Sequence, residues 1–217
     1  MTDKKIFITG GAGYLGSNLV ARYIKDNDVT VYSRDEAKHY YLKKRFPKVN
    51  CIVGDIRNFD LMKRSALKHD IGIFAASLKQ IGAVDQNVEE SAKIIVDGAI
   101  NSRRVAEEVG MEAACFISSD KSRAATTIYV AGESFIVNSS KSNVRLSSAI
   151  YGNVLNSTGS IIPLMWDAIN RGYELTLFSD KMTRFMIDIE EAMNLIEYGL
   201  AVDGYNVIPN LKSFLVK

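Results

Sequence analysis

The sequence comprises 217 residues, of which 47% are hydrophobic and 24% charged, and its formal net charge is +2. These values fit one globular domain with a substantial core, and the interspersed basic and acidic residues exclude a basic stripe for nucleic acid and a polybasic membrane patch. No apolar run approaches ~18 residues and the N-terminus leads directly into a predicted strand, so we expect no signal peptide, no membrane span and a cytoplasmic location.

A glycine-rich turn joins the first predicted strand, at Ile6–Ile8, to a helix predicted at Ser17–Ile24. Strand, glycine-rich turn and helix in this order are typical of a dinucleotide site. Gly10 allows a sharp turn, Gly13 lets the backbone approach a pyrophosphate, and Gly16 lets the helix pack on its strand. The N–H groups at the start of the helix would then face the diphosphate. Since ordinary turns also use glycine, a structural turn is the alternative interpretation.

The rest of the chain alternates between short apolar runs and helical segments. This alternation predicts an α/β fold, a doubly wound parallel sheet with right-handed crossovers and helices on both faces. The further strands are expected at Asp28–Ser33, Val49–Val53, Ile71–Ala75, Ala113–Ser118, Val144–Ser148, Glu174–Leu177, Arg184–Ile187 and Tyr205–Ile208. The further helices are expected at Glu36–Phe46, Phe59–Leu67, Val88–Val109, Thr127–Ser139, Ile161–Asn170 and Ile189–Leu200.

The cysteines and histidines give no sign of a disulfide or a metal centre. Cys51 and Cys115 each lie beside a predicted buried strand, which indicates two free thiols in a reducing compartment. His39 and His69 lie apart from each other in polar surroundings. The sequence therefore predicts no metal site.

The end of the second strand normally selects the cofactor in this kind of sheet, because ligands bind outside the carboxyl ends of the strands. Here Ser33 and Arg34 come first, with Asp35 and Glu36 behind them. A guanidinium and a hydroxyl suit the 2′-phosphate of NADP, because arginine binds phosphate in a bidentate fork. NADP is therefore favoured over NAD. In the alternative, Arg34 is a solvated loop residue and Asp35 accepts hydrogen bonds from the ribose of NAD.

A second acidic residue, Asp55, follows the third strand within the run Gly54-Asp55-Ile56-Arg57. Its carboxylate is suited to accept a hydrogen bond from an adenine amino group, or to cap the helix that follows. The residues leave both interpretations open.

Seven motifs occur in an order that resembles a known family. They are residues 9–16 (TGGAGYLG), 32–36 (YSRDE), 54–57 (GDIR), 75–79 (AASLK), 119–121 (SDK), 151–154 (YGNV) and 182–185 (MTRF). Together they resemble the UDP-N-acetylglucosamine 4,6-dehydratases of bacterial polysaccharide and flagellin-sugar biosynthesis, in the extended short-chain dehydrogenase/reductase superfamily. The resemblance covers nearly the whole chain.

The resemblance implies an internal redox cycle on a UDP-sugar. Hydride leaves C4 of the sugar for NADP⁺, water is eliminated across C5 and C6, and hydride returns to C6. Carried over, Tyr129 is the redox base, Asp120 the acid that protonates the departing 6-hydroxyl, and Lys121 the base at C5. The expected substrate contacts are Lys79, Ser119, Asn153 and Arg184. The expected cofactor contacts are Gly10, Gly13, Tyr14, Leu15, Gly16, Ser33, Arg34, Asp55, Ile56, Ala75, Ala76, Lys79 and Glu133.

Asp120 and Lys121 can serve an elimination only if their side chains diverge around the substrate, because in contact they would stabilise each other's charged forms. An exposed ion pair in a loop is the structural alternative for these two residues. For Tyr129, a half-buried helix tyrosine is the corresponding alternative.

Three positions depart from the family pattern. Glu133 stands where the superfamily carries a lysine four residues after the tyrosine, and an ionised carboxylate there would raise the pKa of the Tyr129 phenol above its usual value of about 10. Ile95 stands where an asparagine is expected, and Ile150 where an arginine is expected. These departures keep two other functions open: a 4-epimerase or other 4-keto sugar modifier, and a catalytically silent NADP-binding sensor or assembly subunit.

The expected organisation is a dinucleotide-binding core at residues 1–155 and a small substrate lobe at residues 156–217, integrated with the core. Since family members continue beyond the position of Lys217, the lobe is expected to be abbreviated. A homo-oligomer is expected to form through the helix at 88–109 and the helix that carries Tyr129, because Ile95, Ala99 and Val105 exceed what one sheet face must cover.

Overall fold

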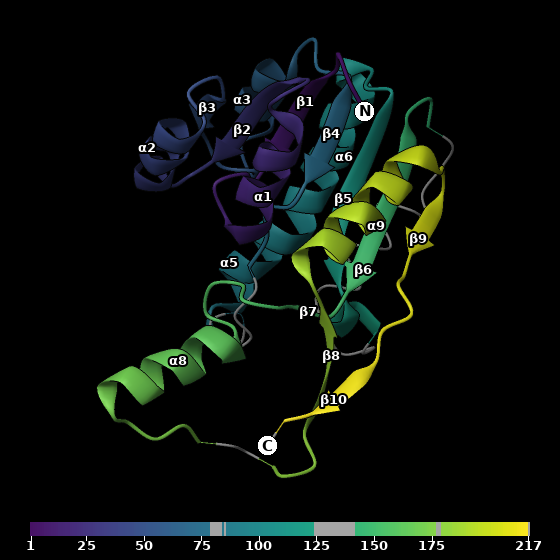
Figure 1. Cartoon of the computed structure of the whole chain (residues 1–217). Helices are drawn as coiled ribbons and strands as arrows, with labels where there is room; N and C mark the ends of the chain where they lie inside the picture. The colour runs from purple at the N-terminus through teal and green to yellow at the C-terminus, as the bar shows by residue number, and fades with distance from the viewer. Residues whose placement is uncertain (79–83, 85, 124–141, 177–178, 217) are drawn as a thin grey trace.

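The computed structural model describes residues 1–78, 84, 86–123, 142–176 and 179–216. Its centre is a seven-stranded sheet in the order β3-β2-β1-β4-β5-β6-β9, with every neighbouring pair parallel. This arrangement confirms the predicted α/β doubly wound fold (Figure 1). The strands are β1 (Lys5–Thr9), β2 (Asp28–Ser33), β3 (Asn50–Val53), β4 (Ile71–Phe74), β5 (Ala113–Ser119), β6 (Arg145–Tyr151) and β9 (Tyr205–Val207).

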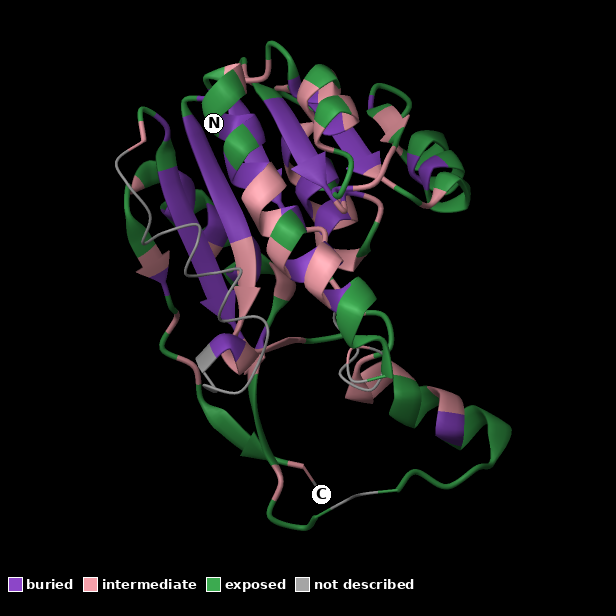
Figure 2. Cartoon of the chain, turned by 180° about the vertical axis from the view of Figure 1, so that it is seen from behind, coloured by how far each residue is buried: buried purple, intermediate pink, exposed green. Residues whose placement is uncertain are grey.

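Helices cover both faces of this sheet, so the strands are apolar on both sides. Within β1, Ile6 and Ile8 pack in one core cluster with α1 (Tyr14–Tyr23), α2 (Glu36–Arg45) and α9 (Ile189–Ala201). The intervening Phe7 packs in a second cluster with α3 (Phe59–Ala66) and α6 (Gly98–Val109). The buried strands of the main sheet are visible between these layers in Figure 2. Packing therefore fixes both faces of the central strands, as it does for β1.

The long helix predicted at residues 88–109 is interrupted by a π-helical turn. It consists of α5 (Val88–Ala92), the π turn η1 (Lys93–Asp97) and α6. Ile95 and Val105, which were expected to be available for pairing with a second copy, are only 7% and 0% exposed because they pack inside this chain. The prediction that these side chains form a spare surface is wrong.

A second, three-stranded sheet lies below the carboxyl ends of the main sheet (Figure 1). It has the order β10-β8-β7, from β7 (Asn153–Val154), β8 (Thr183–Ile187) and β10 (Ser213–Leu215). The strand predicted at 174–177 is wrong over its described residues 174–176, which form no strand. The helix α8 (Ile161–Arg171) projects beside this sheet. The domain boundary at residue 155 stays a prediction. Beyond it, β9 joins the main sheet and α9 packs against one face of that sheet.

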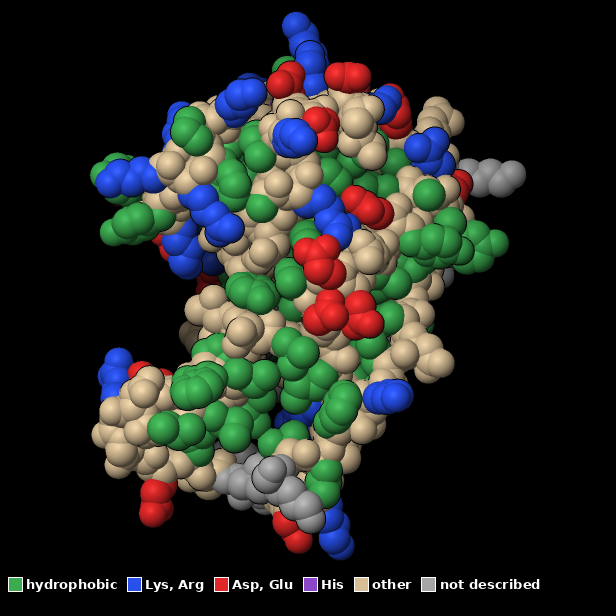
Figure 3. Space-filling model, in the orientation of Figure 1, with side chains coloured by type: hydrophobic (Ala, Val, Ile, Leu, Met, Phe, Trp, Pro, Cys, Tyr) green, Lys and Arg blue, Asp and Glu red, His purple; other side chains and the backbone are tan. Residues whose placement is uncertain are grey.

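The helix α8 exposes several large apolar side chains. On α8, Leu164, Met165, Trp166 and Ile169 are between 44% and 71% exposed, and Figure 3 shows hydrophobic side chains gathered over this region. Among the described residues, no helix is both long and apolar enough to cross a membrane. Several large apolar side chains are thus exposed together on α8.

Candidate functional site

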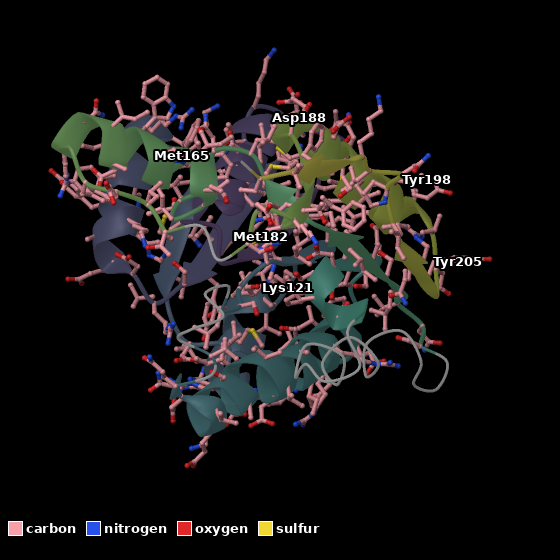
Figure 4. The ribbon with its side chains drawn as sticks, turned by 90° about the horizontal axis from the view of Figure 1, so that it is seen from below. Lys121, Met165, Met182, Asp188, Tyr198 and Tyr205 are labelled. Atoms are coloured by element: carbon pink, nitrogen blue, oxygen red, sulfur yellow. The ribbon has the colours of Figure 1, made fainter. Side chains whose placement is uncertain are left out.

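A cleft with a volume of about 1370 Å³ lies between the carboxyl ends of the main sheet and the second sheet. Figure 4 views the molecule from this side, with Lys121 near the centre. All the predicted site residues that the structure describes line the cleft: Gly10, Gly13, Tyr14, Leu15, Gly16, Ser33, Arg34, Asp55, Ile56, Ala75, Ala76, Ser119, Asp120, Lys121, Asn153 and Arg184. The remaining three, Lys79, Tyr129 and Glu133, lie outside the described residues, as does the helix predicted at 127–139.

The glycine-rich turn brings the start of α1 to the wall of this cleft. Gly10 has a φ of +68°, in the left-handed region, and a Cβ there would lie 3.0 Å from the backbone of Ala76. A Cβ on Gly16 would overlap the backbone of Gly11. The N-cap of α1 is Gly13, which offers no side-chain cap, and the first turn carries no acidic residue. The free N–H groups of this turn are therefore suited to an anionic ligand.

The side chains that follow β2 and β3 meet on the same side of the cleft. Arg34 Nη1 lies 3.8 Å from Asp55 Oδ2. Asp55 also accepts hydrogen bonds from the backbone N, Nε and Nη2 of Arg57, at 2.9, 3.0 and 2.7 Å. The hydrogen bonds from the Arg57 side chain hold the pKa of the Asp55 carboxyl below its usual range. This carboxylate is therefore ionised and fixed in position at neutral pH.

The alternative interpretation of Asp55 as a helix cap is wrong. The helix α3 begins after Asn58, whose side-chain oxygen accepts a hydrogen bond from the backbone N of Leu61 at 3.0 Å. Asn58 satisfies one of the unpaired N–H groups at the start of α3, as an N-cap does. Asp55 instead forms a local turn with Arg57 and faces the cleft.

Asp35, the alternative ribose ligand, is already engaged by α2. It caps this helix by accepting a hydrogen bond from the backbone N of Lys38 at 3.0 Å, and its Oδ2 lies 2.8 Å from Lys38 Nζ. These contacts, the side-chain bond from Lys38 first, lower the pKa of Asp35. Ser33 and Arg34 also line the cleft and precede this cap in the chain.

The surroundings of His39 differ from the polar surroundings predicted for it. The side chain is 5% exposed and its Nε2 lies 2.6 Å from Ser33 Oγ. The signal was its position on α2, three residues before the buried Leu42 and so on the same helical face.

Asp120 and Lys121 lie at the end of β5, in the short 3₁₀ helix η2 (Asp120–Arg123). Ser119 Oγ donates a hydrogen bond to Asp120 Oδ1 at 3.1 Å, and Lys121 N donates to Ser119 Oγ at 3.3 Å. Lys121 Nζ lies 3.6 Å from Asp120 Oδ1, with both side chains about one third exposed. The expected elimination chemistry requires the two side chains to diverge, and in the structure they do not. They form the ion pair that was the structural alternative.

Asn153 and Arg184 come from the second sheet, on the opposite wall of the cleft. Arg184 is exposed and donates to the backbone oxygen of Thr183 at 2.7 Å. The joint between the sheets is tight, because a Cβ on Gly152 would lie 2.8 Å from Phe185 Cβ. The guanidinium of Arg184 is thus held on a strand while its outer face remains open to a ligand.

The two isoleucines that depart from the family pattern fit apolar surroundings. Ile95 lies in the π turn and lines the cleft. Ile150 is 2% exposed within β6, where it packs without a polar partner. Neither position offers the polar group that the resemblance implied.

Comparison with known proteins supports the same assignment of fold and family. Residues 6–208 match the family described as "Polysaccharide biosynthesis protein". The chain is 29% identical over 212 residues to the UDP-glucose 4-epimerase of Rickettsia massiliae, with 90% of this chain and 62% of the relative covered. It is 28% identical over 207 residues to the UDP-N-acetylglucosamine 4,6-dehydratase (inverting) of Campylobacter jejuni, with 89% and 62% covered.

One solved structure with this fold is the Bordetella bronchiseptica enzyme WbmG in complex with NAD and UDP. The TM-score is 0.81 at 22% sequence identity, and the match covers 99% of this chain and 75% of that enzyme. The chain spans less than two thirds of the length of the curated relatives it matches, at 62% of each.

Proposed function

This chain belongs to the polysaccharide biosynthesis protein family, and we propose that it is an NADP-dependent nucleotide-sugar 4,6-dehydratase. Its substrate is UDP-N-acetylglucosamine or a related UDP-sugar, which loses water across C5 and C6 through a 4-keto intermediate. The observation that carries this proposal is the position of Asp120 and Lys121 at the end of β5, where both line the cleft that also contains the glycine-rich turn. Once their ion pair opens, a carboxyl and an amine at this place can supply the acid and the base that an elimination needs.

The residues that line the cleft include groups suited to bind a nicotinamide dinucleotide. The uncapped start of α1, at Gly13, is suited to the pyrophosphate, and Ser33 and Arg34 to a 2′-phosphate. Asp35 is engaged by Lys38, which favours NADP over NAD. When bound, the nicotinamide would take up the C4 hydride and return it.

On the proposed sugar side, Ser119 is hydrogen-bonded to Asp120, Asn153 lines the cleft from β7, and Arg184 would bind the UDP diphosphate. Arginine suits a diphosphate because its planar fork donates two parallel hydrogen bonds to phosphoryl oxygens. Tyr129, from the sequence, would accept the proton of the C4 hydroxyl.

For the elimination, the Asp120–Lys121 pair must open. A partly exposed ion pair of this kind contributes only about 0–1 kcal/mol, so contacts with a substrate are sufficient to separate it. Before the two groups separate, transfer of one proton from the ammonium to the carboxylate converts the pair into a neutral amine and a carboxylic acid. A substrate that excludes water favours this neutral form, because burial penalises charges. Lys121 then takes the C5 proton, and Asp120 gives its proton to the departing 6-hydroxyl, which leaves as water.

The test is incubation with UDP-N-acetylglucosamine and NADP⁺, followed by mass spectrometry for the loss of water. Lys121→Met should abolish water loss and leave NADP binding unchanged. Lys25→Met, at an exposed lysine outside the cleft, is the matched control and should retain activity. Water loss that survives Lys121→Met would contradict the proposed base.

A 4-epimerase is the second candidate, and the similarity to a UDP-glucose 4-epimerase favours it. Epimerisation needs hydride transfer at C4 but no base at C5. It would appear after the same incubation as a chromatographically separate product with the mass of the substrate, formed equally well by Lys121→Met. The third candidate, a silent NADP-binding sensor or assembly subunit, is favoured by Glu133 and would bind NADP without turnover.

A homo-oligomer also remains a proposal, although Ile95 and Val105 do not form its surface. Sedimentation showing only monomer at micromolar concentration would contradict it.

A further inference from the structure

The hydroxyl of Ser33 contacts a buried histidine on the side away from the cleft. His39 Nε2 lies 2.6 Å from Ser33 Oγ, and the imidazole is 5% exposed. Ser33 lines the cleft, whereas His39 does not. The histidine therefore acts on any ligand in the cleft only through the serine.

The other ring nitrogen restricts how the proton can be placed. His39 Nδ1 is buried and has no hydrogen-bond partner among the described residues. Burial lowers the pKa of His39 below its usual value of about 6.5, against an opposing effect of the Asp35 carboxylate, so the ring is neutral at pH 7. A neutral imidazole carries one proton, on Nδ1 or on Nε2.

The two tautomers have different consequences for Ser33. A proton on Nδ1 would be a buried donor with no acceptor, which is rare in folded proteins. A proton on Nε2 avoids this and donates to Ser33 Oγ. The hydroxyl proton of Ser33 is then not used by the histidine and is free to point into the cleft.

We propose that His39 is a positioning residue that presents Ser33 to the cleft as a hydrogen-bond donor, and that this favours a 2′-phosphorylated adenosine. This inference deepens the proposed function and rests on it. Phosphoryl oxygens are charged acceptors without protons, so a serine fixed as a donor matches them, and hydrogen bonds to charged groups are stronger than neutral ones. Arg34, the next residue, supplies the opposite charge.

The test is calorimetric titration of the purified protein with NADP⁺ and with NAD⁺, at pH 7. His39→Leu, which replaces the imidazole by an apolar side chain, should weaken NADP⁺ binding about fivefold, because the Ser33 hydroxyl remains but is no longer held as a donor. NAD⁺ binding should stay within twofold. His39→Gln, which retains an N–H donor, should restore most of the NADP⁺ affinity.

A double-mutant cycle separates positioning from structural damage. In a Ser33→Ala background, His39→Leu should have no further effect on NADP⁺ binding, because its effect passes through the Ser33 hydroxyl. Equal losses for NADP⁺ and NAD⁺, or a full additional loss in the Ser33→Ala background, would overturn the inference. Wild-type protein that prefers NADP⁺ but is unaffected by His39→Leu also overturns it, while the proposed function stands. Wild-type protein that binds neither nucleotide contradicts the proposed function and, with it, the inference.

Discussion

Arg34 and Asp55, which follow neighbouring strands of the main sheet, face each other across 3.8 Å at the rim of the cleft. Asp55 is held mainly by Arg57, with which it makes shorter contacts. The Arg34 side chain remains 57% exposed. Arg34 is therefore tethered weakly enough to turn toward a phosphate without leaving an unpaired carboxylate behind.

We expect NADP(H) to bind at least ~10-fold more tightly than NAD(H), a difference of about 1.4 kcal/mol. Arg34→Ala should remove this preference without unfolding the protein, because the ion pair that it breaks is largely exposed. Calorimetry with both nucleotides measures the ratio. Arg64→Ala, at an exposed arginine on α3, is the control and should keep the wild-type preference. Equal affinities in the unmodified protein would refute the prediction.

Two glycines of the first turn should respond differently to alanine. A Cβ on Gly16 would overlap the backbone of Gly11, which cannot move aside cheaply, so Gly16→Ala should destabilise the fold by about 1–3 kcal/mol. A Cβ on Gly13 meets only the oxygen of Gly10, at 3.2 Å. Gly13→Ala should therefore keep nearly the wild-type melting temperature and instead weaken dinucleotide binding. Denaturant unfolding and nucleotide titration of both variants check this. Equal stability of the two variants would contradict the close packing of Gly16 against the backbone of Gly11.

The pH dependence of the dehydratase rate tests whether Glu133 impairs catalysis. A carboxylate four residues after Tyr129 cannot supply the positive charge that makes a phenol a base near neutrality, so any dehydratase rate should still rise above pH ~8. Glu133→Lys should raise the rate and move its pH dependence toward neutrality. Glu174→Lys, at an exposed glutamate outside the cleft, should do neither. If Glu133→Lys binds NADP but stays inactive at every pH, the dehydratase proposal gives way to the silent binder.

The two cysteines should differ in reactivity. Burial raises the pKa of the Cys115 thiol to about 12, and this side chain is 0% exposed. Cys51 is only partly buried, although burial raises its pKa as well. Iodoacetamide at pH 8.5 should therefore modify Cys51 first, with Cys115 reacting only after unfolding, because the thiolate is the nucleophile. Peptide mass spectrometry identifies the order, and urea-unfolded protein should react at both sites.

The raised pKa of Cys115 also predicts how the free energy of unfolding changes at alkaline pH. Since the folded protein holds Cys115 as a thiol above the ordinary pKa of 9, this group contributes stability below pH 9, and the contribution is lost as pH rises from 9 toward 12. Cys115→Ala should flatten this part of the stability curve, measured by denaturant unfolding, apart from a constant loss due to the smaller side chain. A parallel curve would contradict the assignment.

The parts predicted correctly from sequence are those fixed by local pattern. The alternation of apolar runs and helices predicted the sheet, and the placement of polar residues at strand ends predicted which of them meet in the cleft. The wrong predictions concern features that depend on tertiary packing, such as which side chains are buried. Ile95 and Val105 matched a pairing face by their spacing, but a π turn and the neighbouring elements bury them. Spacing alone does not show which side of a helix the rest of the chain covers.

Asp55 and His39 illustrate the same limit within the site. A cap at Asp55 and a cap at Asn58 differ by less than one turn, and only the observed hydrogen bonds separate them. The neighbours of His39 in the sequence are polar, yet its ring is buried against β2, because the opposite face of α2 is the one exposed to water. Local composition does not reveal such an orientation when a short helix is amphipathic only through a few residues.

The projecting helix α8 carries Trp166, the single tryptophan of the sequence, with 61% of its surface exposed. The indole fluorescence of this chain therefore comes from α8 and not from the glycine-rich turn. Emission should be red-shifted and open to quenching by acrylamide. A blue shift would report any molecule that covers α8, and resonance transfer to a reduced nicotinamide, if one binds as proposed, would report its distance from α8 without an added label.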